Sequence, residues 1–373
     1  MFDIITVGLG AMGSSAAYHL SRRGLSVLGL EQFGPTHQLG SSHGKSRIIR
    51  EAYFENPLYV PLVQRAYECW ADLEAQSGRR VLTSTGGLMM GPTAGTVVGG
   101  ARASAVQHGL PFEELSAVDI LKRFPAFRPA ADDVAIYEPR AGVLDPEAAI
   151  EAHLALARSH GAELHFNEPV QHWSERGDGR LTVQTAVGTY DAAKLVIACG
   201  AWVASLVPEL TLPVVIERNV VHWFESTPSA SFGPASLPIF IHEYEPTHAW
   251  YGFPDLGDGV KLALHHQGET TTADTVRREV APAEVERVRA IAERFLPGAA
   301  ARVRESVVCL YTNTPDEHFI LDTHPAHPSV IVASPCSGHG FKFSSVIGET
   351  IADLAIGGAT RFDLTPFKLG RWS

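Results

Sequence analysis

Cysteine is scarce in this chain, and its spacing fits neither a metal site nor a disulfide framework. Cys69, Cys199, Cys309 and Cys336 are scattered far apart along 373 residues. Such a distribution favours a reducing compartment, and we expect no metal site. The first predicted strand begins at residue 2, which leaves no room for a secretory leader ahead of it. We therefore expect a cytoplasmic protein.

Long apolar runs and an excess of basic charge are also lacking. The nearest candidate for a membrane span, Leu195 to Val207, is too short to cross a bilayer. Thirty Lys and Arg face 41 Asp and Glu, giving a net charge of −11. This balance argues against nucleic acid or an anionic membrane as a partner. The 45% apolar and 19% charged content indicates a globular chain, long enough for two domains.

The beginning of the chain carries the clearest motif. Phe2 to Val7 is a β-branched apolar run typical of a buried parallel strand. Gly8-Leu9-Gly10-Ala11-Met12-Gly13 follows with the spacing G-x-G-x-x-G, then a predicted helix over Ser14 to Arg23. A second strand, Leu25 to Leu30, ends in Glu31. Glycines allow a tight turn and close approach to a pyrophosphate, and the acid can accept from ribose hydroxyls, so the pattern predicts a dinucleotide site. NAD and FAD stay open at this point.

The rest of the chain alternates between two styles. A polar loop, Gly34 to Arg47, either covers a ligand or lies on the surface, and both interpretations stay open. Helical periodicity and capping signals predict further helices. These cover residues 59–78, 145–160 and 345–356, and strands are predicted at 181–185, 195–198 and 329–334.

Residues 212–304 are instead rich in strand formers and aromatics, with one helix predicted over 283–295. They favour an antiparallel sheet with a covering helix. We predict an α/β (α+β) two-domain fold, with a Rossmann-like dinucleotide-binding domain and a second antiparallel-sheet substrate domain. The predicted binding domain is discontinuous, over 1–82, 143–212 and 303–373, and the substrate domain takes 83–142 and 213–302.

Several separated motifs together resemble one family, that of monomeric sarcosine oxidase and N-methyltryptophan oxidase. Besides the glycine loop with Glu31, the resemblance rests on four further runs. They are S-S-H-G-K-S-R-I-I-R-E-A-Y (41–53), Y-G-F-P (251–254), C-L-Y-T-N-T-P-D-E-H-F-I-L-D (309–322) and S-G-H-G-F-K-F-S-S (337–345). The similarity covers essentially the whole chain in order. It implies the fold of glutathione-reductase-like and D-amino-acid-oxidase-type flavoproteins. It also implies a monomer whose partners are a small amino-acid substrate and O2, with no nucleic acid.

The resemblance implies FAD rather than NAD, joined by a thioether from Cys309 to the flavin 8α-methyl carbon. Attack by sulfur needs a thiolate, so we expect a cationic neighbour, which His43 or Arg47 could supply. The implied FAD contacts are Gly8, Gly10, Ala11, Met12, Gly13, Glu31, Gln32, His37, Ser42, His43, Arg47, Val170, Gly200, Trp202, Cys309, Gly338, His339, Gly340, Phe341 and Lys342.

The resemblance also implies the catalytic residues. Lys261 matches a lysine that accelerates reaction with O2, since a fixed cation stabilises the negative charge that develops on oxygen. Arg50 and Lys342 match a pair that grips the substrate carboxylate. His265 and Tyr251 match positions lining the substrate cavity. From pattern alone, a lysine in a strand such as that of Lys261 is usually a solvated outward side chain. Arg50 and Lys342 could form surface salt bridges, and His265 and Tyr251 could pack or hydrogen-bond locally.

Two departures from the family pattern bear on the substrate. His242 stands where an apolar methionine is expected at the pocket wall, and Pro335-Cys336 replaces a Gly-Phe pair. We expect both to reshape the pocket. The predicted activity is oxidation of a secondary amino acid such as sarcosine, giving primary amino acid, formaldehyde and hydrogen peroxide. Alternatives are oxidation of a cyclic imino acid, glycine, a D-amino acid or a glycated amino acid, or a flavin-binding electron carrier without turnover.

Overall fold

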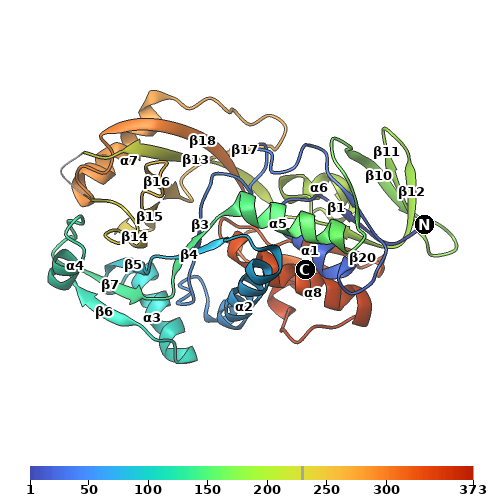
Figure 1. The fold of residues 1–373 in the computed structure, drawn as a ribbon, viewed down its shortest axis with the longest axis horizontal. Helices are drawn as coiled ribbons and strands as arrows, with labels where there is room; N and C mark the ends of the chain where they lie inside the picture. The colour runs from blue at the N-terminus through green and yellow to red at the C-terminus, as the bar shows by residue number, and fades with distance from the viewer. Residues whose placement is uncertain (228–230, 373) are drawn as a thin grey trace.

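Two large β-sheets form the two ends of an elongated molecule in the computed structural model, which describes residues 1–227 and 231–372 (Figure 1). The first sheet has eight strands. They are β1 (Phe2–Val7), β2 (Val27–Leu30), β9 (Glu163–His165), β10 (Val170–Glu175), β11 (Leu181–Thr185), β12 (Thr189–Ile197), β19 (Ile320–Thr323) and β20 (Val330–Ser334).

The centre of this sheet is parallel, as the apolar runs predict. β1 lies between β12 and β2, with Val7 opposite Ile197 on one side and Leu30 on the other. β20 adds in parallel to the end of β12, and β9 adds in parallel to β2. The hairpin of β10 and β11 joins β12 in antiparallel fashion. The carboxyl ends of β1, β2, β12 and β20 therefore meet at one edge, where ligands bind in open α/β sheets.

Helices pack against this sheet and against each other. The central helix α1 (Ala11–Ser21) contacts α5 (Pro146–Ser159) and α8 (Ser344–Gly357), and α2 (Val60–Ser77) contacts both of those. Gly78 ends α2 in the left-handed conformation, at φ 67°. Asp145 caps α5 by accepting from the Ala148 N–H, with Pro146 at the first helical position. These ends agree with the sequence predictions.

The first helix differs from its prediction. α1 begins at Ala11 rather than Ser14, so Met12 and Gly13 already belong to its first turn. Its C-cap is Arg22, in the right-handed helical region, and Gly24 comes two residues later with φ +88°. The early start places the free N–H groups of the helix directly beside the glycine loop.

The second sheet has nine strands and is mainly antiparallel. Within residues 1–227 and 231–372 its one parallel pair, β5 with β14, joins the segment before α5 to the segment after it. The strands are β5 (Gly87–Pro92), β6 (Glu113–Ser116), β7 (Asp133–Glu138), β13 (Val215–Glu225), β14 (Ile239–Glu245), β15 (His248–Phe253), β16 (Val260–His265), β17 (Glu269–Thr271) and β18 (Arg302–Asn313).

Helix α7 (Pro282–Phe295) packs its apolar residues on the face of this sheet that carries Phe240 and Trp250. α3 (Thr96–His108) and α4 (Ala117–Arg123) lie beside β5–β7. Ser116 and Asp119 form a capping box at the start of α4, in which the Ser116 side chain accepts from the Asp119 N–H. Helix α3 escaped prediction because adjacent glycines interrupt its pattern. At one of them, Gly100, a Cβ would lie 2.1 Å from the Phe54 carbonyl oxygen, so this helix packs backbone against backbone.

A small third sheet joins the two halves. β3 (Arg47–Ile49) and β4 (Leu82–Ser84) both pair in antiparallel fashion with β8 (Gly142–Leu144). The short helical turns of the chain are α6 (Val203–Leu206), η1 (Pro57–Tyr59), η2 (Gly200–Trp202), η3 (Pro208–Leu210), η4 (Phe341–Phe343), η5 (Thr365–Phe367) and η6 (Leu369–Trp372). Because β8 ends two residues before α5 begins, its pairing with β3 holds residues 47–49 close to the start of α5.

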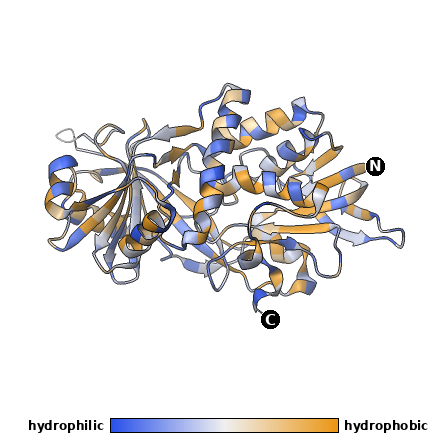
Figure 2. Cartoon of the chain, turned by 90° about the horizontal axis from the view of Figure 1, so that it is seen from below, coloured by the Kyte–Doolittle hydropathy of each residue, from blue (hydrophilic) through white to orange (hydrophobic). Residues whose placement is uncertain are grey.

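Strand β18 pairs with β13 from Arg302 to Asn313, so it belongs to the nine-stranded sheet by its hydrogen bonds. The predicted domain boundary between residues 302 and 303 therefore falls at the start of a strand of that sheet. Figure 2 shows long apolar runs along the strands of both sheets, with hydrophilic residues spread over the helices around them. Among the described residues, no helix is both long and apolar enough to cross a membrane.

Candidate cofactor and substrate site

One continuous cavity runs from the glycine loop after β1 to the face of the nine-stranded sheet. It collects residues from the start, middle and end of the chain. Of the residues predicted to contact FAD or to act in catalysis, all but Gly13 and His43 line it. Those that do are Gly8, Gly10, Ala11, Met12, Glu31, Gln32, His37, Ser42, Arg47, Arg50, Val170, Gly200, Trp202, Tyr251, Lys261, His265, Cys309, Gly338, His339, Gly340, Phe341 and Lys342.

At the first end of the cavity the glycines have separate tasks. Gly8 has φ +87°, and a Cβ there would lie 2.6 Å from the Ala198 carbonyl oxygen. A Cβ on Gly13 would overlap the Gly8 carbonyl oxygen at 1.7 Å, so Gly13 serves the packing of α1 on the loop. A Cβ on Gly10 would meet only the Ser42 Oγ, at 3.5 Å, and would project into the cavity. The loop thus leaves its backbone open toward a ligand.

Glu31 ends β2 beside this loop and is buried, with 5% exposure. Its carboxylate accepts from the Leu9 N–H at 2.8 Å and the Phe33 N–H at 3.0 Å. His37 Nε2 lies 3.4 Å from Glu31 Oε1. The acid therefore holds the glycine loop and still lines the cavity, where its remaining lone pairs are available.

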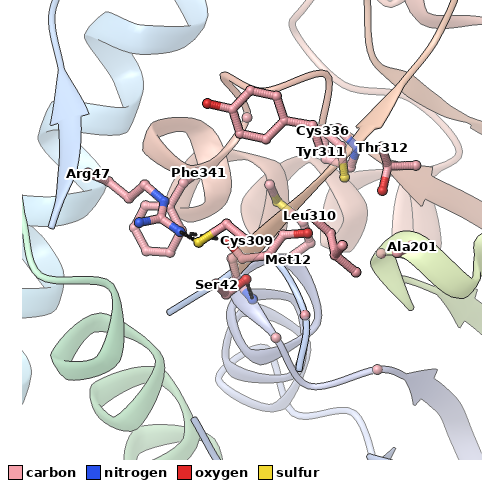
Figure 3. Close-up of a pocket in the computed structure, with 18 of the residues that line it drawn as sticks. Met12, Ser42, Arg47, Ala201, Cys309, Leu310, Tyr311, Thr312, Cys336 and Phe341 are labelled. Atoms are coloured by element: carbon pink, nitrogen blue, oxygen red, sulfur yellow. Dashed lines mark hydrogen bonds between the residues drawn. The ribbon is translucent and has the colours of Figure 1, made fainter. Parts of the chain in front are cut away.

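Cys309, on β18, lines the cavity, and the Arg47 guanidinium points toward its sulfur (Figure 3). Its Sγ is 3.7 Å from His43 Nε2 and 4.0 Å from an Arg47 guanidinium nitrogen. Burial opposes ionisation of the thiol, but His43, Arg47 and Lys261 outweigh it and lower its pKa to about 6. His43 itself is 1% exposed and acts from behind the cavity wall.

Lys261, on β16, is 2% exposed and lines the cavity near Cys309. Its Nζ donates to the Gly44 carbonyl at 2.7 Å, the Ser46 carbonyl at 2.9 Å and the Ser46 Oγ at 3.0 Å. It also lies 5.1 Å from the Trp223 ring centre. Burial, together with Arg47, lowers the pKa of Lys261 well below its ordinary value. The three acceptors match the three N–H bonds of an ammonium and favour the charged form.

A second cationic group forms at Arg50 and Lys342. The Arg50 guanidinium is 1% exposed and donates to both oxygens of Glu55, at 2.7 and 2.5 Å. Its Nε has no partner among the described residues. Lys342 donates to the His339 carbonyl at 2.6 Å and the Tyr53 hydroxyl at 3.3 Å. Burial, followed by the charge of Arg50, lowers the pKa of Lys342 to about 7.

The wall between these groups is aromatic. His265, at the end of β16, lies edge-on to Tyr251, with ring centres 6.1 Å apart, and to Tyr311, at 5.9 Å. Burial lowers the pKa of His265 well below its ordinary value and raises that of Tyr251. Both side chains are therefore neutral near pH 7. They line the same cavity as the basic side chains Arg47, Arg50, Lys261 and Lys342.

The structure corrects one expectation about the pocket wall. His242 does not line the cavity, whereas its neighbour Ile241 does. The His242 ring is completely buried on the opposite face of β14, where Nδ1 accepts from the Trp250 indole at 3.0 Å and Nε2 lies 3.2 Å from Asp133. Successive side chains of a strand point to opposite faces, so its polarity does not reach the site. Pro335 and Cys336 do line the cavity.

Glu55, Ser46 and Tyr311 are among the site residues that had not been predicted. Glu55 pairs with Arg50, Ser46 binds Lys261, and Tyr311 packs beside His265. Ser46 and Tyr311 lie inside runs that carried the resemblance, so only their roles were missed. Glu55 had no such signal, because an acid five residues after an arginine in an irregular segment has no periodic relation to it.

These features fit a flavin dinucleotide. A Cβ on Gly200 would meet nothing within 4 Å, and a Cβ on Gly10 would meet only the Ser42 Oγ. This open backbone beside the N-terminus of α1 leaves space that suits a pyrophosphate. The same cavity continues to a thiol of low pKa and to buried cations. Fold and site together define an oxidoreductase that uses a bound dinucleotide.

Comparison with known proteins gives the family. The model of the FAD dependent oxidoreductase family matches residues 3–354, and the chain belongs to this family. Monomeric sarcosine oxidase from Streptomyces avermitilis is 47% identical over 364 residues, which cover 96% of this chain and 94% of that protein. N-methyl-L-tryptophan oxidase from Salmonella heidelberg is 37% identical over 374 residues, covering 100% and 99%.

Solved structures agree on the fold. NikD, described as an unusual amino acid oxidase essential for nikkomycin biosynthesis, superposes in its open form with a TM-score of 0.86. It is 25% identical and covers 98% of this chain and 97% of its own. Glycine oxidase from Geobacillus kaustophilus, at 22% identity and a TM-score of 0.83 over 99% of this chain and 98% of its own, shares the fold. The predicted fold class, family and FAD dependence are confirmed.

Proposed function

We propose that this enzyme oxidises a secondary N-methyl amino acid such as sarcosine. The amine, O2 and water give the primary amino acid, formaldehyde and hydrogen peroxide. FAD, when bound, accepts the hydride equivalent of the C–H bond and passes two electrons to O2. The names of the two relatives described above, at 47% and 37% identity, support this choice of substrate class.

The pair of buried cations at Arg50 and Lys342 carries the proposal. One guanidinium nitrogen of Arg50 already binds both oxygens of Glu55, and the same group can bind a substrate carboxylate in its place. We infer that the substrate carboxylate replaces Glu55, with the Lys342 ammonium as a second donor. A carboxylate bound there directs the amine toward His265 and Tyr251.

The amine has to be unprotonated when its C–H bond is broken. Neutral His265 and Tyr251 at the cavity wall suit an uncharged amine, because neither brings a negative charge that would favour the ammonium form of the substrate. Lys261 stands apart from this pair, near Cys309. We assign it to the reaction with O2, where its ammonium stabilises the negative charge that oxygen acquires.

We further propose that Cys309 holds the flavin covalently through an 8α-thioether. Its lowered pKa and its place on the cavity wall support this assignment. Glu31 and the segment Gly8–Met12 would bind the other end of the dinucleotide. Four free cysteines and the relatives' description as monomeric support a cytoplasmic monomer.

A peroxide-release screen tests the proposed function. Sarcosine, other N-methyl amino acids, proline, pipecolate and glycated amino acids are compared with one purified preparation. We expect the highest rate with an N-methyl amino acid and formaldehyde in equal amount to peroxide. If no secondary amino acid bleaches the flavin under nitrogen, the protein is a flavin carrier instead. Peroxide without formaldehyde would move the assignment to a cyclic or primary amine.

A further inference from the structure

The ammonium of Lys261 is held entirely by one short stretch of backbone and a hydroxyl. Its acceptors are the Gly44 carbonyl, the Ser46 carbonyl and the Ser46 Oγ. All three are neutral. The position and charge of the ammonium therefore depend on how these dipoles point, and hence on what fixes the loop that carries them.

Glu147 fixes that loop from its other side. This residue lies in the first turn of α5, one residue after Pro146. Its Oε1 accepts from the Gly44 N–H at 2.7 Å, and its two oxygens lie 3.2 and 3.1 Å from the Lys45 nitrogen, which donates to both. One carboxylate thus binds two successive N–H groups, while the carbonyls of the same loop point to Lys261.

The conformation of Lys45 makes this division of the loop possible. Lys45 has φ +62°, a left-handed value that is unfavourable for a residue with a Cβ, and Gly44 before it has φ +97°. The Lys45 side chain points away from the cavity to Asp258 at 3.1 Å and Glu305 at 2.8 Å. A loop in this conformation needs an external partner, and the carboxylate of Glu147 provides one.

We propose that Glu147 is a positioning residue for Lys261. It holds the Gly44–Ser46 loop so that two carbonyls and one hydroxyl receive the ammonium, and it thereby sets the rate at which the reduced enzyme reacts with O2. The inference rests on the proposed role of Lys261. The negative charge of Glu147 also favours the ammonium form of Lys261 across the loop, which adds to the geometric effect.

Two substitutions separate charge from hydrogen bonding. Glu147→Ala removes the anchor, and Glu147→Gln keeps one carbonyl oxygen near the two N–H groups but removes the charge. Glu151→Ala is the matched control, because Glu151 lies one turn further along α5 and pairs with Arg79 on the surface, at 2.6 Å. If the alanine variant does not fold, the glutamine variant carries the test.

Three measurements are made on each holoenzyme. Anaerobic stopped-flow mixing gives flavin reduction by substrate, and mixing reduced enzyme with oxygen gives the second-order rate constant of reoxidation. Amide hydrogen exchange of the peptide containing residues 44–46 reports on the loop without reference to activity. We expect Glu147→Ala to slow reoxidation about tenfold or more, to leave reduction within twofold and to speed exchange of that peptide. Glu147→Gln is expected between Glu147→Ala and wild type, and Glu151→Ala is expected to match wild type in all three.

Lys261→Met distinguishes this inference from the proposed function on which it rests. Should Lys261→Met reoxidise at the wild-type rate, the assignment of Lys261 to oxygen is wrong. Slow reoxidation in Lys261→Met with normal reoxidation in both Glu147 variants overturns the role of Glu147 alone. Equal slowing of both half-reactions, or unchanged exchange at residues 44–46 in Glu147→Ala, would also overturn it.

Discussion

The two cationic groups of the cavity are built differently. Arg50 faces a carboxylate, Glu55, and the pair is neutral as a unit. Lys261 donates to two carbonyls and a hydroxyl, so its hydrogen-bond acceptors are neutral and none of them is a carboxylate. Both side chains are almost completely buried. The contrast therefore lies in their partners and not in their exposure.

This difference matches two different tasks. A substrate carboxylate brings its own negative charge, so a site for it can be kept neutral by a carboxylate that the substrate replaces. Oxygen is uncharged when it arrives and becomes negative only as it is reduced, so a cation that serves it has to be unpaired beforehand. Burying a cation without a counter-ion costs free energy, because the ammonium loses its hydration. The two carbonyls and the hydroxyl that accept from Lys261 offset part of that cost.

Removing the charge of Lys261 should produce the largest effect. In Lys261→Met we expect reoxidation to slow by about 10²–10³-fold, as when a preorganised electrostatic group is deleted from an active site. Flavin reduction by substrate should change little, because Arg50 and Lys342 are intact. Stopped-flow measurement of both half-reactions checks this, with Lys122→Met, at an exposed position of α4, as the surface control. Slowing of reduction by a similar factor would show that the two cationic groups are not separate.

At the other group, Arg50→Met should mainly weaken substrate binding. It removes the guanidinium donor and leaves Glu55 without its cationic partner, and we expect KM to rise on the order of a hundredfold, or about 3 kcal/mol. Burial raises the pKa of Glu55, but Arg50, His339 and Lys342 outweigh burial and lower it to about 2. Steady-state kinetics and reoxidation of the reduced variant are measured side by side. An unchanged KM would contradict the carboxylate site.

The groups that lower the pKa of Cys309, namely His43, Arg47 and Lys261, should also determine how fast its thiol reacts at a given pH. Its pKa is lowered from 9 to about 6, so the thiolate forms as pH rises through 6. In protein prepared without flavin, alkylation of Cys309 should rise about tenfold per pH unit below 6 and level off above it. Arg47→Met should move the midpoint upward. Mass spectrometry of the modified peptide gives the rate, with Cys69 as a buried reference thiol whose pKa is raised. A midpoint near 9 would refute the cationic environment.

The smallest effect concerns Lys342. Its pKa is lowered from 10.5 to about 7, so the ammonium is the form below pH 7 and the neutral amine the form above it. A neutral amine binds a carboxylate less well. We expect KM to rise severalfold between pH 6 and 8, and this dependence should disappear in Lys342→Met. A pH profile that is the same in both proteins would remove Lys342 from the binding step.

The sequence alone predicted those parts of the fold that rest on local patterns. β1, the glycine loop and α5 with its proline and aspartate cap were placed within a few residues, because turn and capping chemistry is local. Nearly every residue predicted for the cavity lines it. Their roles come from the resemblance and stay predictions until the variants above are measured.

What could not be predicted depends on register and on tertiary contact. His242 was assigned to the pocket wall, but a strand presents alternate residues to opposite faces, and a shift of one position moves a side chain out of the site. Glu55 and Glu147 act on partners five and about a hundred residues away. Neither spacing follows from helix or strand periodicity, so no pattern in the sequence indicates them.

The position of β20 has a consequence for how the protein is made. This strand, near the end of the chain, pairs in parallel with β12 in the sheet that contains β1. At about 5–20 residues per second, a ribosome finishes β20 roughly 15–70 seconds after β1. Until then the sheet has an open edge beside β12. Until then the cavity also lacks the residues that β18 and the segment 335–342 contribute to it.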